Sequence, residues 1–178
     1  MLASLSKITG WKVKHKIPSE ILTKAKFSSM LAQSVREAEK DKQTRAAELT
    51  LKMFGLVPWD FRLAQESADL MEEQAAAFYD YRKKKMFLLE SAPEISQRFV
   101  LIHELAHALA DQHFQLEKFI QQGRNDDSAT ARMAVMEGQA QWLMYELMAN
   151  KSGQSLRKDP AMVRMFVNQS SSGLDQYP

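Results

Sequence analysis

Two histidines four residues apart are the clearest sign of chemistry in this sequence, in the stretch "VLIHELAHALADQHF". On a helix, His103 and His107 lie about 40° apart around the axis and roughly 6 Å apart along it, so both imidazoles can reach one metal ion. Glu104 is about 100° around from His103, which places its carboxylate near a water on that ion. This HExxH arrangement supplies two nitrogen ligands, an open coordination position and a general base. Incidental histidines on an amphipathic helix are the alternative, but the pattern is uncommon by chance, and we predict a metal site.

A catalytic zinc ion normally has three protein ligands, so one more must come from another element. Glu117 follows on the same helix but lies too far along it, roughly 15 Å beyond the second histidine. Glu146 lies about 180° around its helix from Glu137, so these two cannot face the same ion. Glu137 is the better candidate, because a carboxylate buried in the apolar stretch "AVMEGQAQW" would be costly without a partner. A buried salt bridge to Arg132 or Arg164 is the alternative.

Two long helices must carry these residues, over about 92–122 and 127–150. Pro93 is tolerated near the start of the first, and its stretch ends at "GRNDDS". Glu137 is about nine residues into the second helix, whereas His107 is up to about fifteen from the end of the first. Simple antiparallel helices would leave the two side chains roughly 9 Å apart along the axis. We therefore expect the first helix to bend or stop near "DQHF", or the helices to cross at a steep angle.

The part of the chain before these helices is expected to hold a strand and further helices. The alternating "WKVKHKIP" predicts a half-buried strand, with His15 on its apolar side as a core histidine. Helical composition then extends to about Met53, with Ser19 or Thr23 as possible N-caps. Asp60 is the expected N-cap of the next helix, which ends near residue 74.

The apolar runs 77–79 and 86–89 flank the polar segment "DYRKKK", which predicts a hairpin, although the Ala-rich start could equally extend the preceding helix. Asp127 or Ser128 is the expected cap of the last long helix. Together these elements predict a mainly helical α+β protein. We expect one domain over 1–178, with N-terminal strand and helices (1–54), a metal-site core (55–153) and a C-terminal tail (154–178).

Composition sets outer limits on function. A chain of 178 residues with 45% hydrophobic content is long enough for one domain with a buried core. Its 24 basic and 22 acidic residues give no large field that favours nucleic acid as a partner. Without cysteine, any metal must be held by nitrogen and oxygen.

No signal peptide or membrane-spanning run is evident, so the polypeptide is expected to be soluble as given. Its compartment is undetermined: the ending "SSSGLDQYP" is typical of a fragment, and an export leader could be absent from this chain.

At this point the residues resemble a known family. HExxH followed by a glutamate on a later helix resembles the gluzincin pattern of zinc metallopeptidases, within the zincins. "HELAHALADQHFQLEKF" and "AVMEGQAQW" are similar to a group of bacterial proteins with HELxHALxDQHF and VEGxA signatures, and so are "GLVPWDF" and "EQAAAFYDYRKKKMFLLE". The resemblance covers about Leu49 to Met148. It implies a zincin-like fold in which the HExxH helix packs under a small sheet or hairpin and a second helix carries the glutamate.

The resemblance implies a role for each matching residue. His103, His107 and Glu137 would bind one Zn²⁺ ion, and Glu104 would be the general base of amide hydrolysis. Two positions depart from the pattern. Ala77 stands where the bacterial group tends to have glycine, and Gln141 stands where thermolysin-like gluzincins have an aspartate behind a ligand histidine.

Zincin resemblance also implies that an extended peptide substrate pairs with a strand near the site, which here is formed by Phe78, Tyr79, Asp80 and Tyr81. The group that would stabilise the oxyanion is not assigned. Tyr145 is two turns beyond the glutamate ligand, and Tyr79 and Tyr81 have no stronger claim from the sequence.

Three further residues are candidates for contacts behind the ligands. Asp111, one turn past His107, permits either a hydrogen bond to a ligand or a structural contact to an arginine. His113 is about 120° around from His107 and is expected to be a core or supporting histidine rather than a ligand. Gln141 is the third.

Two classes of function remain open. The first is a zinc metallopeptidase acting on a peptide or protein substrate, with "HELAH" as its half-site. The second is an inactive metal-binding module that serves as a binding or structural domain. Other divalent ions are compatible with the same ligands. Substrate specificity and oligomeric state are not encoded in any pattern that we can identify.

Overall fold

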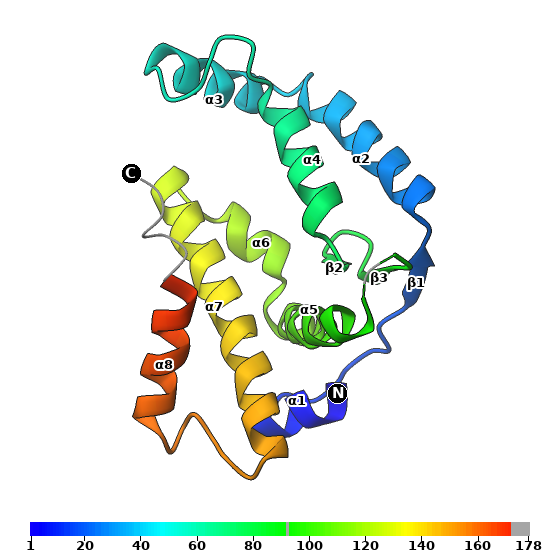
Figure 1. Cartoon of the computed structure of the whole chain (residues 1–178), viewed down its shortest axis with the longest axis vertical. Helices are drawn as coiled ribbons and strands as arrows, with labels where there is room; N and C mark the ends of the chain where they lie inside the picture. Colours follow the sequence, from blue (N-terminus) through cyan, green and yellow to red (C-terminus); the bar gives the residue numbers. More distant parts are fainter. Residues whose placement is uncertain (92, 172–178) are drawn as a thin grey trace. The chain divides into compact units, whose positions relative to one another are not determined.

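Helices make up most of the structure, and three short strands form one small sheet. The computed structural model (Figure 1) describes residues 1–91 and 93–171. In chain order the elements are α1 (Leu2–Thr9), β1 (Ser19–Leu22), α2 (Lys24–Ala38), α3 (Lys42–Met53), α4 (Leu63–Gln74), β2 (Ala77–Asp80), β3 (Lys85–Leu89), α5 (Glu94–Phe114), α6 (Leu116–Gln121), α7 (Asp126–Lys151) and α8 (Pro160–Ser171). This confirms the predicted mainly helical α+β class. Residues 172–178, the last part of the predicted C-terminal tail, lie outside the described residues.

The chain divides into two compact units, which are described separately. The first comprises Met1–Ile17, Tyr81–Lys84 and Leu101–Pro178. The second comprises Pro18–Asp80 and Lys85–Val100. The turn between β2 and β3 therefore belongs to the first unit, and α5 continues from the second unit into the first.

The second unit is built on the sheet, in the strand order β1-β3-β2. β1 pairs with β3 in parallel, and β2 pairs with β3 in the antiparallel direction, with Phe78 opposite Phe87. The antiparallel pair confirms the predicted hairpin, since α4 ends before it. Phe27, Leu31 and Val35 recur at four-residue spacing on α2 and form its buried face. They pack with Phe87 and other buried residues, and each such side chain stabilises the fold by about 1.5–3 kcal/mol.

The predicted strand "WKVKHKIP" is wrong, because strand β1 begins only after it, at Ser19. His15 is exposed rather than buried on a sheet face. The segment is held by the end of α5 instead: the backbone N–H groups of Lys14 and His15 donate to Gln112 Oε1, at 2.8 and 3.1 Å, and Gln112 Nε2 donates to the His15 carbonyl at 2.9 Å. The alternation of residue types in this segment is not matched by alternating burial, because the segment is held by hydrogen bonds to a helix end and residues 12–16 are all exposed.

Helix caps were predicted with mixed success. Thr23 caps α2, accepting from the Lys26 N–H, whereas Ser19 begins a strand. Asp60 does not cap α4, which begins two residues later than expected. Its first N–H group, that of Leu63, donates to the side chain of Glu48 on α3 at 2.9 Å, a distant partner that sequence spacing does not indicate.

The first long helix stops at "DQHF", as one alternative in the sequence argument requires. α5 ends at Phe114, and Gln115 has φ 53° and ψ 67°, the left-handed conformation that breaks a helix. The buried carboxylate of Asp111 accepts the Leu116 N–H at 2.9 Å, which supplies a partner for a group that the break leaves outside the helix ladder. Lys84, in the turn between β2 and β3, donates to both oxygens of the same carboxylate, at 3.0 and 2.7 Å.

The second long helix, α7, begins at Asp126 with Asn125 as its N-cap, two or three residues before the predicted caps. Asn125 and Ser128 form a capping box, so Ser128 contributes as the third helical residue rather than as the cap. Only the C-terminal half of α7 is extensively buried. Its Ala140, Leu143 and Leu147 pack with side chains of α1 and α5 in the core of the first unit.

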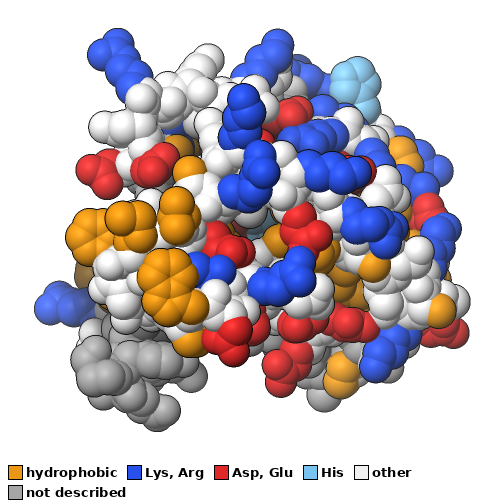
Figure 2. Space-filling model, turned by 90° about the horizontal axis from the view of Figure 1, so that it is seen from above, with side chains coloured by type: hydrophobic (Ala, Val, Ile, Leu, Met, Phe, Trp, Pro, Cys, Tyr) orange, Lys and Arg blue, Asp and Glu red, His pale blue; other side chains and the backbone are white. Residues whose placement is uncertain are grey.

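The face shown in Figure 2 exposes charged side chains of both signs. Lysine, arginine, aspartate and glutamate side chains are intermingled there, beside a group of hydrophobic side chains at one edge. Within the described residues, no helix is long and apolar enough to cross a membrane.

The helix break gives a prediction about Gln115. Glycine adopts its left-handed conformation without steric cost, so Gln115→Gly should raise the free energy of unfolding by about 0.5–1 kcal/mol. Gln115→Val should lower it, because a β-branched residue fits this conformation poorly. The matched control is Gln33→Gly in the regular helix α2, where glycine should lower it by about 1 kcal/mol. Urea denaturation would test this, and a loss of stability in Gln115→Gly would contradict the assigned break.

The carboxylate of Asp111 gives a second prediction. Asp111→Asn should lower the free energy of unfolding by about 1–2 kcal/mol, because a buried acceptor of three hydrogen bonds loses its charge. The value is moderate because the Lys84 side chain is 54% exposed and can be solvated. Glu117→Gln, which removes only the exposed pair with Arg82, should change it by less than about 0.5 kcal/mol. Equal effects of the two variants in urea denaturation would show that Asp111 has no special role.

Candidate metal centre

The two histidines of the HExxH motif lie on one face of α5, as their four-residue spacing requires. Their rings are 4.6 Å apart between centroids and nearly perpendicular, at 82°. The His107 side chain is 2% exposed and that of His103 is 18% exposed. Packing therefore restricts both rings before any ion is bound.

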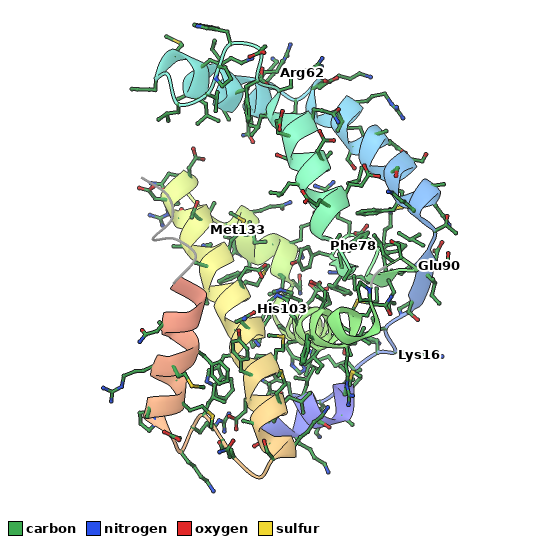
Figure 3. The ribbon with its side chains drawn as sticks, in the orientation of Figure 1. Lys16, Arg62, Phe78, Glu90, His103 and Met133 are labelled. Atoms are coloured by element: carbon green, nitrogen blue, oxygen red, sulfur yellow. The ribbon has the colours of Figure 1, made fainter. Side chains whose placement is uncertain are left out.

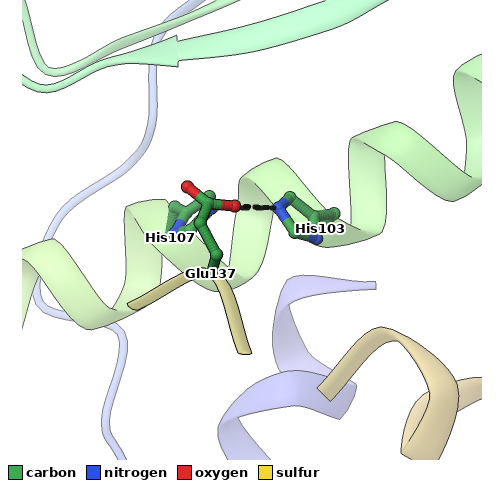
Figure 4. Close-up of side chains that lie close together, drawn as sticks. All are labelled: His103, His107 and Glu137. Atoms are coloured by element: carbon green, nitrogen blue, oxygen red, sulfur yellow. Dashed lines mark hydrogen bonds and ion pairs between the residues drawn. The ribbon is translucent and has the colours of Figure 1, made fainter. Parts of the chain in front are cut away.

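Glu137, from α7, completes a cluster of three ligand atoms (Figure 4). Its Oε2 is 3.0 Å from His103 Nε2 and 3.3 Å from His107 Nε2, and the two Nε2 atoms are 3.0 Å apart. The three residues form a group that could hold a metal ion. The structure thus brings together the three residues that the sequence argument selected as ligands.

The distances fit one small cation with nitrogen and oxygen ligands. Zinc binds imidazole nitrogen and carboxylate oxygen at about 2.0–2.2 Å in tetrahedral geometry, which places neighbouring ligand atoms about 3.3–3.5 Å apart. The observed separations are equal to this or slightly shorter. The two Nε2 atoms and the carboxylate oxygen converge on one point, which is the arrangement that a shared ion requires.

The electrostatics of the cluster favour an ionised Glu137. Hydrogen bonds from His103 and then from His107 hold the pKa of its carboxyl well below the usual range. His107 Nδ1 is buried and has no hydrogen-bond partner among the described residues. A histidine that binds metal through Nε2 usually donates from its other ring nitrogen, so this site departs from the common pattern.

One argument for Glu137 was wrong although the residue it selected is in place. Its side chain is 55% exposed, so it is not a carboxylate buried in an apolar stretch. The alternative ion pair with Arg132 is not formed either: Arg132 donates to the Phe119 carbonyl at 3.1 Å and lies over the Phe119 ring. Glu137 is placed by the geometry of its helix rather than by a need to neutralise a buried charge.

Both devices that the sequence argument proposed for joining the helices are present. α5 stops early, at Phe114. In Figure 1 it is seen nearly end-on, whereas α7 is seen from the side along its whole length, so the two helices cross steeply. His103 lies between them in Figure 3. A steep crossing removes the axial offset that would separate the histidines from Glu137 in an antiparallel pair.

The remaining predicted residues have distinct positions. Glu104 is half-buried on α5 and is not a member of the ligand cluster. Asp111 makes the structural contact that was one of its alternatives, although with a lysine rather than an arginine. His113 donates from Nε2 to the Lys12 carbonyl at 2.8 Å and so holds the N-terminal segment. Gln141 is half-buried, one turn beyond the glutamate on α7, and its supporting role stays a prediction.

The four residues proposed to pair with substrate fall into both compact units of the chain. Phe78, Tyr79 and Asp80 lie in β2, within the second unit, where the Phe78 ring stacks on Phe87 at 5.0 Å. Tyr81 begins the turn that belongs to the first unit. The pairing of a peptide with this strand stays a prediction.

Tyr81, which the sequence argument named only as one of several candidates for the substrate strand and for the oxyanion donor, lies next to the centre. Its ring stands edge-on to that of His107, with centroids 6.3 Å apart at 82°. Burial raises the pKa of Tyr81, and the charges of Glu104, Glu137 and Asp111 raise it further. The sequence separates Tyr81 from the HExxH motif by more than twenty residues, and only the turn's contact with α5 reveals the proximity.

Comparison with known proteins identifies a family that this chain matches. The profile of the IrrE N-terminal-like domain, named Peptidase M78, matches residues 64–162, which is more than half of the chain and includes all three cluster residues. No curated protein and no solved structure matches. The family is related to zinc metallopeptidases, and some members are regulators or binding modules. A mainly helical chain with a small sheet and an HExxH helix agrees with a zincin-like fold. The chain therefore belongs to the IrrE N-terminal-like domain family.

Proposed function

We propose that this protein is a zinc-dependent metallopeptidase of the gluzincin type, which hydrolyses peptide bonds. The observation that carries the proposal is that three possible ligand atoms, contributed by two helices, lie 3.0–3.3 Å from one another. Family membership supports it, because the family is related to zinc metallopeptidases.

In this proposal His103, His107 and Glu137 hold one zinc ion. When bound, such an ion supplies a Lewis acid that polarises the scissile carbonyl and lowers the pKa of an attacking water. Glu104 takes the proton of the attacking water and passes it to the leaving amine. Its place beside His103, about 100° around α5, directs its carboxylate to the side of the cluster rather than into it.

The arrangement of the ligands favours a catalytic over a purely structural site. Structural zinc sites are normally closed by four protein ligands, whereas catalytic sites keep one position for water or substrate. Among the described residues, the cluster contains three possible ligands. The exposed carboxylate of Glu137 leaves one side accessible to solvent.

Metal content tests the ligand set. The purified wild type should contain about one zinc ion per chain, and Glu137→Ala should lose most of it, because two histidines alone bind zinc much more weakly. The control is His113→Ala, which removes an imidazole from the same helix without touching the cluster and should retain zinc. Elemental analysis after dialysis would measure both. Retention of zinc by Glu137→Ala would show that the third ligand is wrong.

Proteolysis tests the activity. The zinc-loaded wild type should cleave unfolded casein or a quenched-fluorescence peptide library, and Glu104→Gln should reduce kcat by roughly 100-fold or more while retaining zinc, because it removes the general base. Glu66→Gln, an exposed residue on α4, is the matched control and should be unaffected. Stoichiometric zinc without any Glu104-dependent cleavage would favour the alternative, an inactive metal-binding module.

A further inference from the structure

Peptide hydrolysis needs a donor for the negative charge that develops on the scissile carbonyl oxygen, and HExxH does not supply one. Three tyrosines were candidates. Tyr145 stacks on Phe166 at 4.2 Å between centroids, and it lies about 12 Å along α7 from Glu137. Tyr79 is buried in the sheet of the second unit. Tyr81 is the candidate that the structure places next to a cluster residue.

The position of Tyr81 relative to the cluster is defined by two independent observations. Its ring contacts His107 edge-on, and it packs against the small core formed by Ala110, Leu116 and Met136. Met136 immediately precedes Glu137, so the ring packs against a core to which both the HExxH helix and the helix of the third ligand contribute. These contacts of the ring restrict the directions in which its hydroxyl can point.

The turn that carries Tyr81 is fixed to the metal-site helices by ion pairs. Lys84 binds the buried carboxylate of Asp111, one turn beyond His107 on α5. Arg82 binds Glu117 on α6 at 3.2 Å. Both partners lie in the first unit with the cluster. The turn is therefore attached to α5 and α6 on either side of the Gln115 break, and Asp111 acts as a positioning residue for Tyr81.

From this geometry we infer that the Tyr81 hydroxyl is the hydrogen-bond donor to a negatively charged oxygen held at this centre, which in peptide hydrolysis is the oxyanion of the scissile carbonyl. The inference rests on the proposed function for its catalytic consequence. A phenol is a suitable donor, since it is neutral and protonated at physiological pH. No covalent bond to Tyr81 forms or breaks, and its proton stays on the phenol throughout.

Removing only the hydroxyl tests the inference. Tyr81→Phe keeps the ring and its packing, so zinc content and the midpoint of thermal unfolding should not change. We expect kcat on the peptide library to fall by roughly 10- to 1000-fold, with KM within about 3-fold, because an oxyanion donor acts in the transition state. Tyr145→Phe is the matched control and should retain full activity. Asp111→Asn should lower kcat less than Tyr81→Phe does.

A binding measurement gives a readout besides activity. Acetohydroxamate places an anionic oxygen on a protein-bound zinc ion, and its affinity for the zinc-loaded wild type and Tyr81→Phe can be compared by calorimetry. Loss of a hydrogen bond to a charged oxygen should weaken binding by about tenfold. Tyr145→Phe should bind acetohydroxamate like the wild type.

The two measurements separate the inference from the proposed function. Cleavage by the wild type that is unchanged in Tyr81→Phe overturns the role of Tyr81 and leaves the peptidase proposal standing. Absence of Glu104-dependent cleavage overturns the peptidase proposal, and acetohydroxamate binding then decides the inference: weaker binding by Tyr81→Phe supports the donor role, and equal binding overturns it.

Discussion

The crossing of α5 and α7 is the constraint on which the candidate metal centre depends. One helix can supply two imidazoles but no third ligand in the right direction, so the carboxylate must arrive from a second helix. Ile102 and Leu109 of α5 pack against Leu143 and Leu147 of α7 in a core closed by Leu5 of α1. Each buried side chain contributes about 1.5–3 kcal/mol, far more than the ion pairs on the surface. The apolar contact therefore fixes the crossing, and the polar cluster forms where it directs the side chains.

The break after Phe114 is the second requirement, and Asp111 links it to the rest of the site. Its carboxylate accepts the first N–H after the break and also binds Lys84 of the turn that carries Tyr81. One buried charge thus joins the end of the HExxH helix, the start of α6 and the turn. Because a buried carboxylate is stable only with such partners, its position ties the three segments to one geometry.

The local chemistry of the site could be predicted from the sequence, whereas its long-range contacts could not. The HExxH spacing fixes the face of a helix, and the offset between His107 and Glu137 required an early stop or a steep crossing, both of which occur. The burial assumed for Glu137 was wrong, because helical periodicity does not reveal which part of a long helix is covered. The strand predicted around His15 failed because its segment is held by hydrogen bonds to Gln112, about a hundred residues away, a contact that local alternation does not reveal. The sequence could not rank Tyr81 above Tyr79 and Tyr145, because its proximity to His107 depends on ion pairs between distant segments.

The graded exposure of the three cluster residues bears on how the centre would work. The side chains of His107, His103 and Glu137 are 2%, 18% and 55% exposed, so the cluster is walled on the histidine side and open on the carboxylate side. A fourth ligand would approach from the more exposed side, where Glu137 meets solvent. Low accessibility on the opposite side shields the imidazoles from water, which strengthens the electrostatic attraction between their ring nitrogens and a bound cation. This asymmetry favours a centre that exchanges water or substrate on one side while its histidines stay fixed on the other.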